Sequence, residues 1–255
     1  MKKSDLWLIA PFVVCIGLAI VFGVPDIIPY KDETLGRLLS DTVPRLAVGA
    51  FLIPLMCIKG FGSIFKPKWE WKHLLWSIPC FLVAIVNFPF TALICGEAVI
   101  THIKLLALFI LKCISIAVLE EVFFRALLVP IFMKRFNKNR YGVLITVVVT
   151  SALFALMHLI NLFFGAGAGE TFLQVGYTFL IGCMFAIMLL RTKNIWLCIL
   201  VHAVFDIGGT IVTDLGSGAF QDLTFWILTA VAGVICLVHC VFALIKLQKD
   251  KNKNE

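Results

Sequence analysis

The stretch LLALFILKCISIAVLEEVFFRALLVPIFM, from Leu105 to Met133, decides the fold class of this chain. It exceeds the roughly 20 apolar residues that cross a bilayer core about 30 Å thick, at a rise of about 1.5 Å per residue. Three charged residues, Glu120, Glu121 and Arg125, nevertheless stand in its second half. A charge inside a bilayer costs roughly 2.5–3.5 kcal/mol on insertion scales, so such residues are candidates for function.

The whole chain has the composition of a membrane protein. Of its 255 residues, 61% are hydrophobic and 15% charged, whereas soluble domains are about half apolar and a quarter charged. Among its long apolar stretches, Val43–Ile58 is the weakest candidate for a membrane span, because Arg45 and Pro54 interrupt it. We therefore expect an all-α, polytopic membrane bundle of about eight transmembrane helices, built as one domain over residues 1–255. The expected spans are Leu6–Val24, Val43–Ile58, Leu74–Cys95, Leu105–Met133, Tyr141–Phe164, Phe172–Leu190, Ile195–Val212 and Leu223–Ile245.

The basic residues behind the net charge of +7 are concentrated in alternate loops. They precede the first span, separate spans two and three, four and five, and six and seven, and fill the tail at 246–255. The other loops are poor in Lys and Arg. This alternation follows the positive-inside rule for a bundle with both termini in the cytoplasm. It also identifies the lipid bilayer, and no nucleic acid, as the expected partner of these charges.

The nine cysteines fall mostly inside the apolar spans and include no C-x-x-C pair. We interpret them as small buried hydrophobic residues rather than as disulfides or a zinc site.

Helical spacing assigns different surroundings to the two glutamates. Glu121 and Arg125 are separated by four residues, share one helical face and can form an ion pair. Glu120 is rotated from Glu121 by about 100° around the helix, so it faces something else. Lys112, earlier in the same span, is expected to pair with a carboxylate or contact a backbone carbonyl.

Two other spans carry polar residues that could join Glu120. His202 and Asp206 share one face of their span, and His158 lies one turn after Phe154 in another. The helical rise places Glu120 about 20 Å, His158 about 25 Å and His202 about 11 Å from the basic ends of their helices. These depths predict convergence in the cytoplasmic-to-middle part of the bundle.

This set of residues suits two kinds of site. A carboxylate in an apolar cavity can act as a general base, and donors aimed at an oxyanion complete a hydrolytic site. Two histidines with carboxylates could equally bind a divalent metal such as zinc. The sequence contains neither H-E-x-x-H nor G-x-S-x-G. The non-hydrolytic alternatives are a structural clamp in an immunity or interaction protein, and a proton-coupled transporter, for which no paired Gly/Pro-interrupted halves are found.

Three short motifs make the chain resemble the CAAX protease and bacteriocin-processing family of intramembrane endopeptidases, also called the Abi family. EEVFFR at 120–125 matches its Glu-Glu-x-x-x-Arg motif, and FALMH at 154–158 matches Phe-x-x-x-His. HAVFD at 202–206 matches a histidine followed four residues later by Asn or Asp. Each motif is weak alone, but three in order on three different spans form a specific signal. The motif-bearing core covers residues 105–212.

The resemblance implies a role for each matched residue. Glu120 corresponds to the general base that activates water, with His158 beside it. His202 and Asp206 correspond to the pair that positions or stabilises the oxyanion, and Glu121 and Arg125 to a supporting pair. The prenyl-protein endopeptidases of the family carry Asn where this chain has Asp206.

An ionised carboxylate cannot donate a hydrogen bond to an oxyanion. Asp206 is therefore protonated, orients His202, or ligates a metal, and the sequence leaves these three options open. No cofactor is certain, and a divalent metal held by the four candidate catalytic residues stays possible.

The resemblance also implies a function. We expect an integral protein of a bacterial plasma membrane that hydrolyses a peptide bond in a membrane-associated protein or peptide. Prenylated C-terminal tails are the task of eukaryotic members. The compact chain and short loops favour the bacterial tasks, which are peptide maturation and bacteriocin self-immunity.

Overall fold

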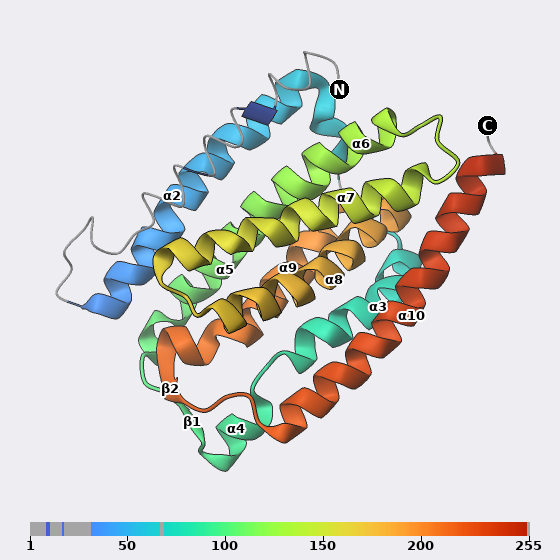
Figure 1. Ribbon diagram of the computed structural model, residues 1–255. Helices are drawn as coiled ribbons and strands as arrows, with labels where there is room; N and C mark the ends of the chain where they lie inside the picture. Colours follow the sequence, from blue (N-terminus) through green and yellow to red (C-terminus); the bar gives the residue numbers. More distant parts are fainter. Residues whose placement is uncertain (1–8, 11–16, 18–31, 67–68, 254–255) are drawn as a thin grey trace.

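The computed structural model describes residues 9–10, 17, 32–66 and 69–253, and this part of the chain is almost entirely helical (Figure 1). Most of the first expected span, Leu6–Val24, lies outside the described residues. The elements are α2 (Glu33–Met56), η2 (Cys57–Phe61), η3 (Gly62–Phe65), α3 (Trp71–Val86), α4 (Phe90–Cys95), β1 (Ala98–Ile100), η4 (Ile103–Leu105), α5 (Leu106–Glu121), η5 (Val122–Leu128), α6 (Val129–Arg135), α7 (Gly142–Met157), η6 (His158–Phe164), α8 (Ala168–Thr192), α9 (Ile195–Leu215), β2 (Gly216–Gly218) and α10 (Leu223–Lys253).

By length and composition, six helical segments of the described chain could cross a membrane. They correspond to the second, third, fifth, sixth, seventh and eighth expected spans: Glu33–Phe65, Trp71–Cys95, Gly142–Phe164, Ala168–Thr192, Ile195–Leu215 and Leu223–Lys253. The fourth expected span is a continuous helix made of α5, η5 and α6, and it is not among those six. The total of eight spans stays a prediction.

Side-chain caps explain where three of the helices begin. Asp32 accepts a hydrogen bond from the Leu35 N–H at 3.0 Å at the start of α2. Asn194 accepts from the Trp196 N–H at 3.0 Å before α9, and Asp222 accepts from the Phe225 N–H at 2.7 Å before α10. Each cap satisfies a backbone donor that a helix leaves without an intrahelical partner.

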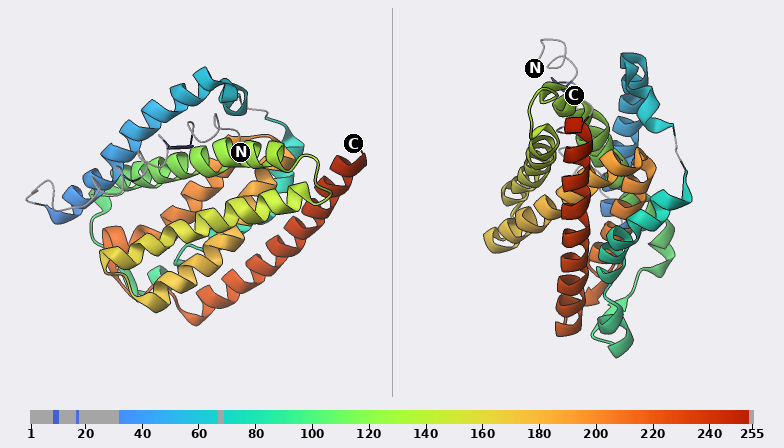
Figure 2. Two further views of the ribbon diagram at one scale, coloured as in Figure 1. Left: turned by 45° about the horizontal axis from the view of Figure 1, so that its top comes forward. Right: turned by 90° about the vertical axis from the view of Figure 1, so that its right-hand side faces the viewer.

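The helices pack as a bundle in which several neighbours in space are distant in sequence, although α7 and α8 follow one another in the chain. α5 packs against α9 and α2, α7 against α8, and α3 against α10 and α9. α10 runs along one edge of the bundle over nearly its full length (Figures 1 and 2). All seven residues of η5 are buried, so the middle of the α5–α6 helix forms part of the core.

The basic loops gather at one end of the bundle. The turn between α6 and α7 lies beside the last turns of α10, at the upper right of Figure 1. Gln248 of α10 accepts a hydrogen bond from the Val143 N–H at 3.1 Å, and the Lys251 Nζ donates to the Asn139 carbonyl at 3.2 Å. α4 and the short antiparallel pair β1–β2 lie at the opposite end. The sequence did not predict these two strands.

Candidate active site

The first two site residues, Glu120 and Glu121, end α5, where the backbone widens into the π-helical turn η5. In this turn the Val129 N–H donates to the Phe124 carbonyl, five residues back instead of four. π-helical turns are rare and occur often at functional sites.

Glu121 is completely buried and has two partners. Its Oε1 lies 3.1 Å from the Arg125 Nη1, which is the ion pair that the spacing of four residues predicts. The same oxygen lies 2.9 Å from the His202 Nδ1. A single carboxylate oxygen therefore joins α5, η5 and α9.

The ring of His202 is positioned by these contacts. A carboxylate held beside an arginine accepts hydrogen bonds, so the proton between Glu121 and His202 belongs to Nδ1. The other ring nitrogen, Nε2, lies 3.7 Å from the Glu120 Oε2 and 3.5 Å from the Asp206 Oδ2. His202 thus stands among three carboxylates, with its Nε2 directed at the two that are not paired with Arg125.

The three carboxylates differ in their access to the outside of the protein. The side chains of Glu120 and Asp206 are 19% and 20% exposed, whereas that of Glu121 is 0% exposed. The Asp206 Oδ2 atom itself is buried and has no hydrogen-bond partner among the described residues. Glu120 and Asp206 are therefore the acids that a water or a substrate can approach.

Aromatic rings enclose the charged groups. The Arg125 guanidinium lies 4.3 Å from the ring centre of Phe154 and 5.2 Å from that of Phe185. Phe185 also stacks on His202, with ring centres 5.1 Å apart. Cation–π contacts of this kind favour a buried guanidinium. Phe154, the first residue of the FALMH motif, therefore has a structural reason to be aromatic.

His158 occupies a different place from the other candidates. It is the first residue of the 3-10 helix η6, its Nδ1 lies 3.0 Å from the Phe154 carbonyl, and its ring packs edge-on against the Phe154 ring. In the part of the chain that the structure describes, no hydrogen bond or ion pair joins His158 to Glu120, His202 or Asp206. The structure thus brings Glu120, His202 and Asp206 together, whereas the Phe154 ring lies between His158 and His202.

A metal does not fit these side chains as they are placed. A zinc ion needs three or four donors at about 2.0–2.3 Å, so its donor atoms must all lie close together. Among the described residues, no three of Glu120, His158, His202 and Asp206 bring donor atoms within 4.8 Å of one another. We therefore derive no chemical step through a metal, and metal dependence stays a prediction.

A second charged cluster lies towards the other end of α5. The Lys112 Nζ lies 2.7 Å from the Asp214 Oδ2 of α9 and 3.6 Å from the Asp41 Oδ2 of α2. Asp41 also pairs with Arg45 at 2.9 Å. This arrangement confirms that Lys112 pairs with a carboxylate. It also places Arg45, which weakened the second expected span, inside a network that neutralises it.

Two features of the site were missed from the sequence. The contact between Glu121 and His202 joins residues 81 positions apart, and no local spacing rule indicates it. The wide turn η5 was read as ordinary helix, because its residues are as apolar as those around it. An intramembrane histidine on a different span was the only signal that could have suggested a partner for Glu121.

Comparison with known proteins now gives one match. Residues 102–208 match the family model of the Type II CAAX prenyl endopeptidase Rce1-like proteins. No curated protein and no solved structure matches the chain significantly. The matched segment begins one residue before η4 and ends within α9, and it contains the Glu-Glu-x-x-x-Arg, Phe-x-x-x-His and His-x-x-x-Asp motifs. Over residues 102–208, this match agrees with the resemblance to the CAAX protease and bacteriocin-processing family that the three motifs indicate.

Proposed function

We propose that this protein is an intramembrane endopeptidase in which Glu120 activates a water molecule. The observation that carries the proposal is the placement of His202, whose Nδ1 is fixed by Glu121 while its Nε2 faces Glu120 and Asp206. The buried Glu121 holds one ring nitrogen of His202, and the accessible Glu120 lies at the other ring nitrogen. This arrangement is suited to proton transfer.

Charge balance supports a protonated His202 in this site. Of the carboxylates of Glu120, Glu121 and Asp206, one is paired with Arg125, so a proton on Nε2 reduces the charge of this group of residues from two negative charges to one. Protonated His202 can then donate from Nε2 to the oxyanion that forms when water attacks a peptide carbonyl. Asp206, which cannot donate when ionised, serves in this scheme to orient His202.

Glu120 supplies the remaining step. It removes a proton from the attacking water and passes it to the leaving nitrogen, so the peptide and one water become a carboxylic acid and an amine, and the acid's own proton then passes to the amine to give a carboxylate and an ammonium group. Its exposed fraction of 19% leaves room for that water. The role of His158 beside Glu120 stays a prediction from the family resemblance.

We further propose that the substrate is a membrane-associated peptide or protein, cleaved at the cytoplasmic side of a bacterial plasma membrane. The support for this proposal is the placement of the polar cluster among helices that are long and apolar enough to cross a membrane. Peptide maturation and self-immunity against bacteriocins are the biological tasks that we propose to test first.

The experiment is cleavage of a candidate leader peptide by membranes that contain the wild type, Glu120→Gln or Glu120→Asp. Removing a positioned general base costs about 10²- to 10⁴-fold in rate, and withdrawing the carboxylate by one methylene should cost a similar amount. The matched control is Glu70→Gln, whose side chain is 49% exposed in the loop before α3. Cleavage by folded Glu120→Gln at the wild-type rate would contradict the proposal.

One observation favours a second reading. Glu121, Arg125 and His202 form a closed, buried unit that could exist only to hold α5 and α9 together, as in a non-catalytic immunity or interaction protein. In that case Glu120→Gln would change neither cleavage nor melting temperature, and His202→Ala would lower the melting temperature without any change in proteolysis.

A further inference from the structure

A second cluster of potential ligands lies where α3 packs against α10, on elements other than those that carry Glu120, Glu121 and Arg125. The side chains of Cys80, Cys236 and Cys240 are buried there, with exposed fractions of 0%, 4% and 5%. Their three sulfur atoms all lie within 4.8 Å of one another, and those of Cys236 and Cys240 are 4.0 Å apart. We propose that these three thiols bind one Cu(I) ion.

The spacing of the sulfurs matches a three-coordinate ion. Metal–thiolate bonds of about 2.3 Å place three sulfurs about 4.0 Å apart when the ion lies in their plane. Cys236 and Cys240 are separated by four residues, so they project from one face of α10 towards Cys80 on α3. The donors are thus already gathered by the packing of two helices.

The number and kind of donors favour Cu(I) over zinc. Structural zinc sites almost always have four ligands, and soft thiolates without a fourth donor select Cu(I). Within the described ranges, no histidine, carboxylate or further cysteine offers a fourth donor atom within 4.8 Å of all three sulfurs. Other buried cysteines, Cys113 and Cys198, belong to no such group, although their burial is equally complete. Burial of small hydrophobic residues therefore does not by itself explain the cluster.

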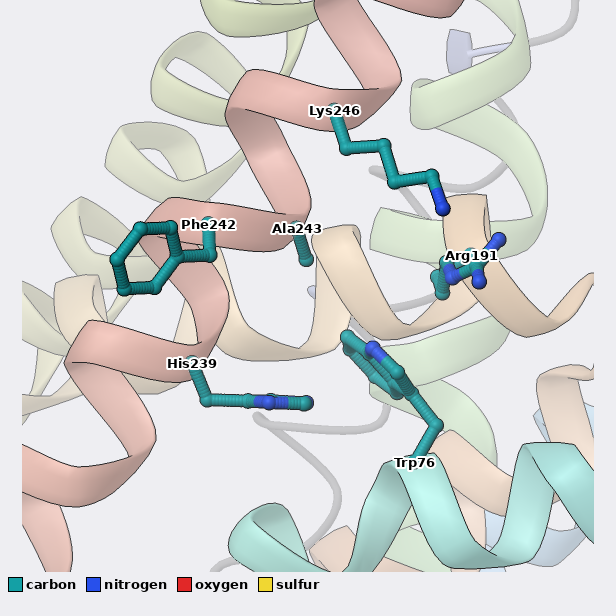
Figure 3. A pocket seen from close by; sticks show the side chains of 6 residues that line it. All are labelled: Trp76, Arg191, His239, Phe242, Ala243 and Lys246. Atoms are coloured by element: carbon teal, nitrogen blue, oxygen red, sulfur yellow. The ribbon is translucent and has the colours of Figure 1, made fainter.

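A pocket of about 250 Å³ is lined by residues of the two helices that carry the cysteines, among them Trp76 of α3 and His239 of α10 (Figure 3). Trp76 and His239 both line it and their rings are in contact, with ring centres 4.5 Å apart, and Ala243 is also part of the lining. Trp76 precedes Cys80 by one turn, and His239 directly precedes Cys240. Arg191 and Lys246 also line the pocket.

The charges around the pocket suit a thiolate-bound ion. Binding converts three thiols into thiolates and releases three protons, so a complex with one Cu(I) carries two negative charges. The guanidinium of Arg191 and the ammonium of Lys246 supply two positive charges at the adjoining pocket, and both side chains point towards the same space in Figure 3.

The experiment is a Cu(I) titration of the full chain in detergent, reduced and free of oxygen, against a colorimetric Cu(I) chelator. We expect one ion per chain, and X-ray absorption should show three sulfur neighbours at about 2.3 Å. Cys80→Ala and Cys236→Ala should each lower the affinity by about 100-fold or more, since even outer-shell changes cost 10- to 100-fold. Cys113→Ala, which removes a buried cysteine outside the cluster, should bind as the wild type does.

Three results would overturn the proposal. The wild type could bind no more Cu(I) than Cys80→Ala does, or it could bind a tetrahedral zinc ion instead of Cu(I). The third result is a disulfide among the three cysteines that resists the reductant. X-ray absorption of the wild type decides the matter even where a cysteine variant does not fold. Glu120→Gln should keep the full Cu(I) affinity, so this site and the proposed protease site can fail independently.

Discussion

Glu120 and Glu121 are adjacent in the chain, yet the rotation of about 100° between them gives each a different environment. Glu121 turns inward to Arg125 and His202 and has no exposed surface. Glu120 turns to a partly open space beside the His202 Nε2. The two acids should therefore respond differently to substitution.

We expect Arg125→Ala to destabilise the protein more than Glu120→Ala does. Arg125 is 1% exposed, and its removal leaves the buried Glu121 carboxylate with only His202 as partner. Loss of one member of a buried ion pair costs about 3–5 kcal/mol, whereas a typical point substitution costs about 1 kcal/mol. Melting temperature and yield after detergent extraction measure the difference. If both variants lose the same stability, the two glutamates form one structural unit and Glu120 loses its catalytic role.

For single residues, the sequence predicted side-chain contacts within one helix but did not predict contacts between two helices. The spacing of four residues correctly predicted Glu121 with Arg125 and placed His202 beside Asp206, because residues one turn apart on a helix are neighbours. The contact of Glu121 with His202 depends on how α5 packs against α9, which no local pattern reports. His158 shows the same limit, since its depth along the helix did not reveal that Phe154 would separate it from the other candidates.

At the scale of elements, α9 is positioned by close backbone contact with the end of α3. The Asn87 side chain donates to the Phe205 carbonyl at 2.8 Å. A Cβ on Gly208 would lie 2.7 Å from the Phe88 Cδ2 and 2.9 Å from the Phe88 backbone nitrogen. α9 carries both His202 and Asp206, so this contact helps to set the position of the site.

Gly208→Ala should lower the stability by about 1–3 kcal/mol, the usual cost of overpacking a filled contact. The matched control is Gly233→Ala in α10, where a Cβ would meet nothing within 4 Å. Alanine there should stabilise the helix by up to about 1 kcal/mol. Thermal melting of both variants in one detergent provides the comparison, and an unchanged melting temperature for Gly208→Ala would show that α3 and α9 can separate at no cost.

Helix positions were the most predictable part of the fold, because long apolar stretches have few other solutions in a bilayer. Val43–Ile58 was expected to be the weakest span, yet α2 is longer than the apolar stretch and begins ten residues earlier, at the Asp32 cap. It contains Pro44 and Pro54 within a helix, and its Arg45 is neutralised by Asp41. Such compensation by a neighbouring side chain is invisible to a hydropathy pattern.

At the scale of the whole molecule, charge is divided between the two ends of the bundle. The α6–α7 turn and the end of α10 carry clusters of Lys and Arg, whereas β1, β2 and α4 at the opposite end are flanked by both acidic and basic residues, among them Glu97, Lys104 and Asp222. The structure thus gathers the alternate basic loops on one side, as expected of a chain that obeys the positive-inside rule. The direction of the bundle in the membrane stays a prediction.

A reporter fused after residue 255 should read as cytoplasmic. Green fluorescent protein at that position should fluoresce, and alkaline phosphatase, which needs an oxidising compartment for its disulfides, should stay inactive. The paired control is the same reporter inserted between Phe220 and Gln221, in the loop before α10 at the opposite end. Active phosphatase at the C-terminus would reverse the orientation and move the proposed cleavage to the other face of the membrane.

The wide turn between Glu121 and Val129 has one further consequence. Its hydrogen bonds span five residues, so it contains one residue more than an α-helix of the same length would need. Deleting one residue from 122–128 would restore an ordinary helix and turn everything after it by about 100° relative to the acids. Lys134 and Arg135 would then leave their present side of the helix while Glu120 and Glu121 kept theirs. A single inserted residue therefore fixes the phase between the acidic end of α5 and the basic end of α6.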